Sequence, residues 1–548
     1  MNKYIIIILS FFLAAGYSCT ESTEEETQRS GANSIYATFE DGSGFFNPET
    51  ASPYGDTIKF IFSTHFPAKS DNVIDITRMS LKAYLPVSVM LPDGSEFVDL
   101  TKQTTITVVQ TDGTKKQCIV KGVIRKSSEA QIKEFSLPSS NLSGFVIEQS
   151  KTVGLVAGGI DLTSQKPKVT LAPHSTISPD TSIVQDFSKP FAYTVTAENG
   201  TKAIYTVKPI TPQKLASGLR TESGRLLWKK TLPEMGIDGA NHMSTSIAIS
   251  EGNLVVNTRN ENNKYFDRFM GKFLGEMTMG DIHLANLKNF FSTNDDAGNI
   301  IISNLTTAVG QDLFLYKWKG VNDITPEKLV QWKVDIVGSQ AGRKISVKGD
   351  LNGDALIYMG ASKSNNTIYR WQVKGGVVQS QAPEKIIYPG AKKWDLYADV
   401  VPVGTSTSDK VYISAYPSDM VCTDLASGEI FGQVNLTAAG FGYNHSIDLA
   451  TFNKAQYLSA ISISTLNGFS ILYDVTNPVL LSTLPTSPDY SKVCILKTET
   501  MTSLANGNAT GDVLLKVSDD GYKMILYVFV TNGGVAAYEF DCIDVDKL

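Results

Sequence analysis

A turn followed by a short apolar strand recurs six times in the second half of the chain, and this repeat constrains the fold more than any other feature. The six units begin at Gly252, Gly298, Gly353, Asp409, Gln456 and Gly521. Their spacing of about 45 to 65 residues is the length of a four-stranded propeller blade. Because the apolar runs are short and show no helical period, the chain is expected to be all-β.

A second strand, rich in aromatic and charged residues, follows most of these units, as in Leu315–Trp318 and Ile368–Trp371. The last unit leaves almost no chain for an outer strand, but Leu226–Lys230 precedes the first unit and could supply it. Pairing of these two ends would close a ring. We therefore predict a β-propeller over residues 213–548, with six blades preferred and seven as the alternative. A second string of β-sandwiches is the competing interpretation.

The first half carries a different repeat, at an offset of 87 residues, as from Asp99 to Asp186 and from Gly113 to Gly200. Each copy has the pattern of a β-hairpin with an Asp-Gly or Asn-Gly turn. A three-residue loop with a bulge is preferred, because it places Tyr193 and Tyr205 on one apolar face. Copies of about 90 residues with short strands predict two tandem immunoglobulin-like sandwiches, over residues 33–126 and 127–212.

The amino-acid sequence of the second copy is also characteristic. Pro190–Thr201, followed by Tyr205–Val207, resembles the closing hairpin of the Ig-like modules common in Bacteroidetes surface lipoproteins. The resemblance is close in the second copy and weaker in the first. It covers about a third of the chain and implies that these modules serve as a spacer or stalk more than as an active site.

The N-terminal segment predicts the cellular location of the protein. Residues 1–18 have the build of a secretory signal, with Lys3 at the start, an apolar run too short to span a bilayer, and small residues before Cys19. The segment resembles the signal of a bacterial lipoprotein, in which the cysteine is lipidated. Residues 19–32, with four glutamates, read as a flexible acidic tether. Such acidic residues resemble the signal that sends Bacteroidetes lipoproteins to the outer face of the outer membrane. A conventional secretory peptide is the alternative.

Composition and spacing exclude several classes of partner and cofactor. A formal net charge of −6, without a basic run, gives no reason to expect nucleic acid as a partner. The cysteines after Cys19 stand far apart, which argues against zinc and favours buried free thiols. Asp350, Asn352 and Asp354 have the alternating oxygen spacing of a calcium loop, but no distal glutamate completes it. We therefore expect no cofactor, with calcium at these three residues as the alternative to an ordinary turn.

Propellers commonly bind ligands at the loops that enter the innermost strands. The candidate ligand-binding residues in these loops are Asn241, His242, Arg343, Lys344, Trp394, Tyr397, Tyr443 and His445. Aromatic faces beside amide, imidazole and guanidinium donors suit sugars, whose C–H faces stack while their hydroxyls form hydrogen bonds. The competing interpretation is that these side chains simply fill the centre of the propeller.

No catalytic residue is predicted. Hydrolysis of a glycosidic bond needs two carboxylates on either side of that bond, and Asp295, Asp296 and Asp395 lie in segments that we assign to these loops. Surface aspartates in turns are common, however, and the chain shows no nucleophile elbow, phosphate loop or dinucleotide fingerprint.

Together these patterns favour a non-catalytic surface lipoprotein that captures a ligand, and the family resemblance implies that this ligand is extracellular glycan. The family resemblance implies a place in an outer-membrane uptake complex of the kind associated with polysaccharide-utilisation loci, with contact to the membrane through the lipid alone. Two alternatives remain: a propeller hydrolase or lyase acting on polysaccharide, and a protein-binding or adhesive scaffold.

Overall fold

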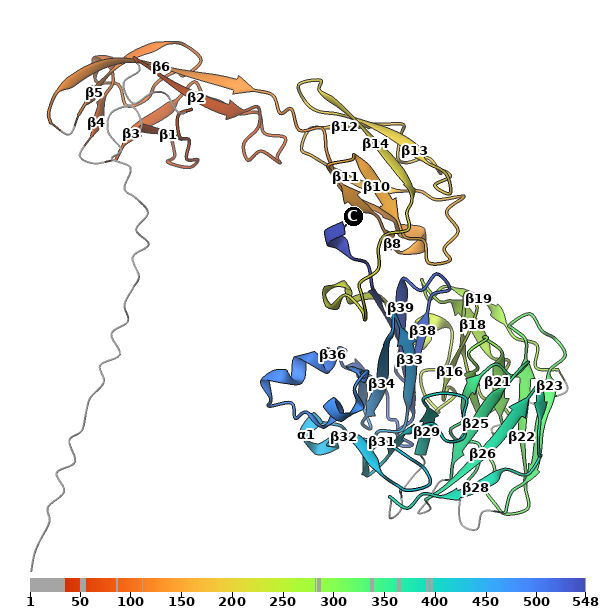
Figure 1. Cartoon of the computed structure of the whole chain (residues 1–548). Helices are drawn as coiled ribbons and strands as arrows, with labels where there is room; N and C mark the ends of the chain where they lie inside the picture. The colour runs from red at the N-terminus through yellow and green to blue at the C-terminus, as the bar shows by residue number, and fades with distance from the viewer. Residues whose placement is uncertain are drawn as a thin grey trace, which may run out of the picture. The chain divides into compact units, whose positions relative to one another are not determined.

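The protein is all-β in its computed structural model (Figure 1). The structure describes residues 35–49, 56–84, 87–110, 112–280, 282, 287–335, 340–361, 366–390, 394 and 398–547. Within these ranges the single α-helix is α1 (Leu436–Ala439), and no helix is long and apolar enough to cross a bilayer. The chain divides into two compact units, residues 1–131 with 171–177 and 195–203, and residues 132–170 with 178–194 and 204–548.

The first module contains two sheets. One pairs β1 (Ile35–Phe39) with β3 (Met79–Ala83), and the other has the order β2-β6-β5-β4. Its strands are β2 (Thr57–Ser63), β4 (Ser88–Met90), β5 (Thr104–Val109) and β6 (Lys115–Arg125). The core between the sheets includes Phe60, Val120 and Cys118, so this cysteine is one of the buried thiols that the sequence predicts.

The second module has one sheet of order β12-β13-β14-β10-β9 and one of order β11-β7-β8. Its strands are β7 (Ile132–Leu137), β8 (Leu142–Ser143), β9 (Phe145–Ile147), β10 (Thr152–Leu155), β11 (Lys168–Leu171), β12 (Thr176–Ser178), β13 (Phe191–Thr196) and β14 (Lys202–Pro209). The amide of Ala197 donates to the carbonyl of Thr201, which confirms the three-residue hairpin loop. Tyr193 and Tyr205 are both fully buried, as that loop length predicts.

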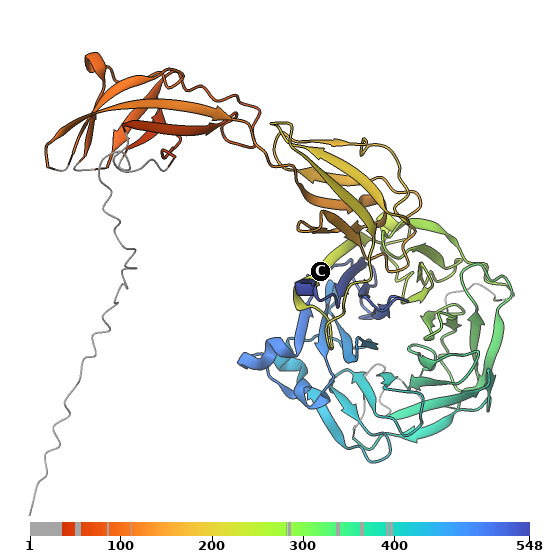
Figure 2. The same cartoon turned by 45° about the horizontal axis from the view of Figure 1, so that its top comes forward.

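Six antiparallel sheets follow, and we call them the ring. They have the orders β16-β17-β18-β19, β20-β21-β22-β23, β24-β25-β26-β27 with β28 beside β26, β29-β30-β31-β32, β33-β34-β35-β36 with β37 beside β35, and β15-β40-β39-β38. Figure 2 shows these sheets arranged around a common centre. Counted from the innermost strand outwards, every apolar unit noted in the sequence forms the second strand of its sheet.

The strand bounds of the ring are β15 (Arg225–Thr231), β16 (Ile247–Ser250), β17 (Asn253–Val256), β18 (Lys264–Asp267), β19 (Phe273–Glu276), β20 (Phe291–Asn294), β21 (Ile300–Ser303), β22 (Asp312–Trp318), β23 (Glu327–Lys333), β24 (Ser346–Gly349), β25 (Ala355–Gly360), β26 (Thr367–Lys374), β27 (Val377–Val378), β28 (Glu384–Ile387), β29 (Ala398–Pro402), β30 (Val411–Ala415), β31 (Ser418–Thr423), β32 (Ile430–Val434), β33 (Ile447–Phe452), β34 (Ala455–Ile463), β35 (Asn467–Asp474), β36 (Cys494–Lys497), β37 (Met501–Thr502), β38 (Gly511–Val517), β39 (Lys523–Val530) and β40 (Gly534–Asp541).

The ring is closed in two ways. Its first strand, β15, pairs antiparallel with its last strand, β40, as the sequence predicts. The innermost strands also contact one another in a complete circle, β16, β20, β24, β29, β33, β38 and again β16. Because no sheet at either end lacks a neighbour, the apolar faces of all six sheets are covered.

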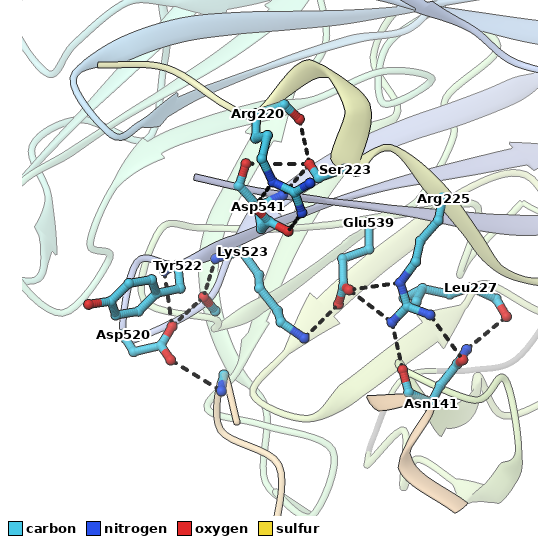
Figure 3. Close-up of polar contacts among 12 residues, drawn as sticks. Asn141, Arg220, Ser223, Arg225, Leu227, Asp520, Tyr522, Lys523, Glu539 and Asp541 are labelled. Carbon is cyan, nitrogen blue, oxygen red and sulfur yellow. Dashed lines mark hydrogen bonds and ion pairs between the residues drawn. The ribbon is translucent and has the colours of Figure 1, made fainter. Parts of the chain in front are cut away.

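A polar network ties the second module to the ring within the second compact unit (Figure 3). The side-chain amide of Asn141 donates to the carbonyl of Leu227 in β15 at 2.8 Å. Arg225 donates to the backbone carbonyl of Asn141 at 2.6 Å and to the Glu539 carboxylate at 2.9 Å. Lys523 lies 3.2 Å from the other oxygen of Glu539. The two strands that close the ring therefore also hold the second module.

Candidate functional site

Polar side chains connect the innermost strands of the ring. Asp399 in β29 accepts a hydrogen bond from the amide of Ile447 in β33 at 3.0 Å. Asp448 in β33 accepts from the amide of Leu515 in β38 at 2.6 Å. Asp512 in β38 accepts from the amide of Ile247 in β16 at 3.0 Å, which joins the last sheet to the first. Because innermost strands of neighbouring sheets share no backbone ladder, these carboxylates satisfy amides that would otherwise lack acceptors.

A buried ion pair lies at the same level of the ring. The ammonium of Lys344 is 2.6 Å from Asp512, and each side chain is only 3% exposed. Ser446 donates to the same carboxylate oxygen at 2.6 Å. The Lys344 ammonium also lies 4.8 Å from the centre of the Phe291 ring. A charge this deeply buried is tolerated only with such partners, so Lys344 and Asp512 depend on each other.

A cavity of about 320 Å³ lies inside the ring, among the innermost strands. Its charged lining includes Asp399, Asp448, Asp512 and Lys344, and also Asp296 and Lys348. Burial raises the pKa of Asp399 to about 6, although nearby Lys344 acts in the opposite direction. Burial likewise raises the pKa of Asp448 to about 7, against the hydrogen bond from Leu515. The centre of the ring therefore holds two carboxyl groups that titrate near neutral pH.

These two pKa values predict a pH-dependent stability. A carboxyl group whose pKa is higher in the folded state than in the unfolded chain stabilises the fold fully below about pH 4 and loses that contribution as the pH rises towards 7. As the pH rises from 5 to 8, the free energy of unfolding of Asp448→Asn should increase by about 2 to 3 kcal/mol relative to that of the wild type. Urea unfolding at the two pH values measures this difference.

The exposed Asp112 supplies the control, because hydrogen bonds from Thr114 lower its pKa. The free energy of unfolding of Asp112→Asn should therefore not increase relative to that of the wild type as the pH rises from 5 to 8. Equal changes in stability for wild type and Asp448→Asn would contradict the assigned protonation of Asp448.

A second group of residues lies where the innermost strands begin, and we call it the entry-side cluster. Its members are His242, Arg259, Phe290, Arg343, Tyr416, Tyr443 and His445. Because each sheet is an antiparallel meander, the loop between its second and third strands lies on the same side as the loop that enters its innermost strand. This topology brings Arg259 and Tyr416, from the former loops, beside residues of the latter.

Ring contacts hold the cluster together. The rings of Tyr416 and Tyr443 are 4.5 Å apart, and Tyr443 stacks on His445 at 5.7 Å. His445 is fully buried, and burial, Lys344 and Arg343 lower its pKa to about 3, so it is neutral. Burial and the charge of Arg259 also lower the pKa of His242. Both tyrosines remain half-buried, so part of each side chain is exposed to solvent.

The structure brings five of the eight predicted ligand-binding residues to the centre of the ring. His242, Arg343, Tyr443 and His445 belong to the entry-side cluster, and Lys344 lies beneath it in the ion pair. Asn241 is exposed and donates to Asp238 at 3.1 Å.

The other predicted residues lie elsewhere. Trp394 is fully buried in the core around β29 and β30, and its indole N–H donates to the carbonyl of Ala361. Its bulk is used for packing, which leaves no face for a ligand. Tyr397, Asp395 and Cys19, with the expected signal segment 1–18 and the tether 19–32, fall outside the described residues.

Asp295 and Asp296 follow β20, at the exit end of that strand, and not in an entry loop as the sequence analysis assumed. Asp295 is buried and accepts from the side-chain amide of Asn299 at 2.7 Å and from the amide of Leu351 at 2.9 Å. The misplacement arose because the turn residues before β21 were counted as the entry to the innermost strand.

The three residues with calcium-loop spacing form an ordinary turn with protein partners. Asp350 accepts from the amide of Asn352 at 2.8 Å, and Asp354 pairs with Lys374 at 2.9 Å. Asn352 accepts from Lys317 at 3.1 Å. Among the described residues, no group of three or more His, Cys, Asp or Glu residues could hold a metal ion. The expectation of no cofactor, with calcium at this turn as the alternative, stays a prediction.

Sequence reasoning missed the three inter-sheet carboxylates and three members of the cluster, Arg259, Phe290 and Tyr416. A signal for the carboxylates was present. In Ala398–Val400, Ile447–Leu449 and Gly511–Val513, one aspartate interrupts a run that otherwise reads as a buried strand. A charge at such a position is expected only where it has a specific partner.

Comparison with known families finds a match to the segment that forms the ring. The model of a domain of unknown function, DUF8500, matches residues 226–546, from β15 to just beyond β40. The chain belongs to the DUF8500 family. Two further domains of unknown function match upstream of the DUF8500 segment, DUF8499 over residues 132–209 and DUF5018 over residues 14–122. A search of curated proteins finds no match.

Solved structures similar to this DUF8500 protein are distant. A DUF4623 family protein from Bacteroides eggerthii DSM 20697 is 14% identical with a TM-score of 0.47, over 75% of this chain and 98% of that one. The WD40 β-propeller domain of Doa1 is 10% identical with a TM-score of 0.31, over 63% and 86%. The computationally designed Ika8 protein is 11% identical with a TM-score of 0.27, over 76% and 97%.

Proposed function

We propose that this protein is a non-catalytic cell-surface lipoprotein that binds extracellular glycan through a six-bladed β-propeller. In this proposal the ring is the propeller, and the first and second modules are Ig-like spacers. Six antiparallel meanders, a circle of contacts between innermost strands and the pairing of β15 with β40 support the propeller assignment.

The observation that carries the proposal is the chemistry of the entry-side cluster. Two half-buried tyrosines, Tyr416 and Tyr443, lie in ring contact, and Tyr443 stacks on His445, whose pKa the charge of Arg343 helps to lower. Aromatic faces stack against the C–H faces of sugars, and guanidinium and phenol groups form hydrogen bonds with hydroxyls. The combination suits a glycan better than an apolar ligand.

The bonding of the central carboxylates supports a binding role over a hydrolytic one. Asp399 and Asp448 accept from backbone amides of neighbouring sheets, and Asp512 accepts from Lys344, Ser446 and an amide. A general acid or nucleophile must present an oxygen to the substrate. One oxygen each of Asp399 and Asp448 is instead used to hold neighbouring sheets together.

The cellular location of the protein is a further part of the proposal. Cys19 is the lipidated residue, the tether 19–32 and the two modules extend the ring from the outer membrane, and the partner is an uptake complex for polysaccharide. The signal segment 1–18 and the acidic tether 19–32 support this location.

A polysaccharide panel tests the proposal with soluble protein, residues 30–548. Both retention of the protein and release of reducing ends are scored. We expect retention without release, and a loss of at least tenfold in affinity for Tyr443→Ala, as expected when a stacking face is removed. Tyr84→Ala, in the first module, is the matched control and should bind as the wild type does. Release of reducing ends would establish an enzyme, and failure to retain any polysaccharide would favour a protein partner.

A further inference from the structure

The second module and the ring share one hydrophobic core. Val156, which follows β10 of the second module, is 2% exposed and belongs to the same buried cluster as Phe540 in β40 and Ile543 just after it. Phe145 in β9 packs against this cluster, and so does Ile210, which follows β14. Two domains joined only by a linker are free to move relative to each other, whereas a shared apolar core holds them in one arrangement.

The segment that connects β14 to β15 is itself bonded to the ring. The amide of Leu215 donates to the carbonyl of Cys542 at 2.8 Å, and the amide of Arg220 donates to the carbonyl of Asp541 at 2.7 Å. The Arg220 guanidinium also donates to both oxygens of the Asp541 carboxylate, at 2.9 and 2.6 Å. The side-chain amide of Asn453 donates to the carbonyl of Leu215 at 3.0 Å. Because its backbone groups have partners in the ring, this segment is part of the ring structure and not a free linker.

The polar contacts of the second module meet at the pairing that closes the ring (Figure 3). Arg225 in β15 and Glu539 in β40 are 314 residues apart in sequence, and they pair at 2.9 Å. Asn141 of the second module contacts both Arg225 and Leu227 through its backbone carbonyl and its side-chain amide. Bringing together two strands so distant in sequence has a large entropic cost, so their pairing depends on the contacts around it. The second module supplies several of these contacts.

We infer that the second module holds the ring closed, by packing on the strands β15 and β40 and bonding to them, and is therefore more than a spacer. The segments matched by DUF8499 and DUF8500 then form one cooperative unit, although separate family models match them. Weakening the second module, or its contact with the ring, loosens the ring first where β15 pairs with β40. This inference goes beyond the proposed function and does not depend on a ligand.

Native-state hydrogen exchange of residues 30–548, without ligand, tests the inference. Val156→Asp places a charge in the shared core, and we expect the amides of β15 and β40 to exchange about tenfold faster or more than in the wild type. Amides of β25, in another sheet of the ring, should change less. Val184→Asp is the matched control, because it adds the same charge to the second module at a position that is 54% exposed. It should leave the exchange of β15 and β40 unchanged.

A second pair of variants carries the test if Val156→Asp does not fold. Tyr193→Ala opens the core of the second module and Phe60→Ala that of the first, and both side chains are fully buried in the wild type. Tyr193→Ala should speed exchange in β15 and β40 about threefold or more, whereas Phe60→Ala should not. Unchanged exchange of the closing strands in Val156→Asp and Tyr193→Ala would overturn the inference and leave the second module as a spacer alone. Equal acceleration by Val184→Asp or Phe60→Ala would also contradict it, since the effect would then not be specific to the contact with the ring.

Discussion

Lys344→Met is expected to lower the free energy of unfolding of the ring by about 3 to 5 kcal/mol, because it leaves the buried Asp512 without its counter-charge. The same change removes the group that opposes the rise in the pKa of Asp399. Asp512 would then keep only Ser446 and the amide of Ile247 as partners. Urea unfolding at neutral pH measures the loss.

Lys348→Met is the matched control, since it removes an identical charge from a more exposed position of the same segment. Lys348 lies 3.2 Å from Asp296, and the two side chains are 23% and 51% exposed. Exposed pairs contribute about 0 to 1 kcal/mol, so this variant should be nearly as stable as the wild type. Equal losses for the two lysine variants would contradict the role assigned to the buried pair.

Trp228→Ala is expected to have an effect of similar size, about 3 to 5 kcal/mol, because it empties the core where the ring closes. Trp228 lies in β15, packs among residues of the first and last sheets such as Ile249 and Tyr527, and donates from its indole to the carbonyl of Arg268 at 3.0 Å. Loss of this anchor weakens the pairing of β15 with β40 as well as the core. Thermal and urea unfolding monitored by circular dichroism would show the loss.

The control for this prediction lies on the same strand. Leu226 pairs with Tyr538 in β40 and is 43% exposed, so Leu226→Ala keeps the strand and removes little buried area. It should cost far less than Trp228→Ala. A comparable loss for both variants would show that Trp228 is not what anchors the closing strand.

Much of the fold follows from local patterns in the sequence. The six turn-and-strand units were found because each second strand is apolar and begins at a turn, and the closing role of Leu226–Lys230 followed from a shortage of chain after the last unit. The hairpin of β13 and β14 followed from alternation, which permits only one loop parity. These features depend on neighbours in sequence, so a single chain suffices to reveal them.

The site depends on contacts between distant segments, and there the sequence analysis was less complete. It selected Arg343, Tyr443 and His445 by their place before innermost strands, but it missed Arg259, which reaches Phe290, as Arg343 does, from another loop. It also selected Trp394, whose ring is used in the core. Whether a loop aromatic faces solvent or packs inward is decided by tertiary contacts, which periodicity does not encode.

Hydrogen exchange with and without bound polysaccharide reports where on the chain the ligand lies. We expect protection in the entry-side segments, around residues 241–260, 340–345 and 441–446, with the first module unchanged. Protection confined to residues 35–131, or to the turns at the exit ends of the innermost strands, would contradict binding at the entry-side cluster.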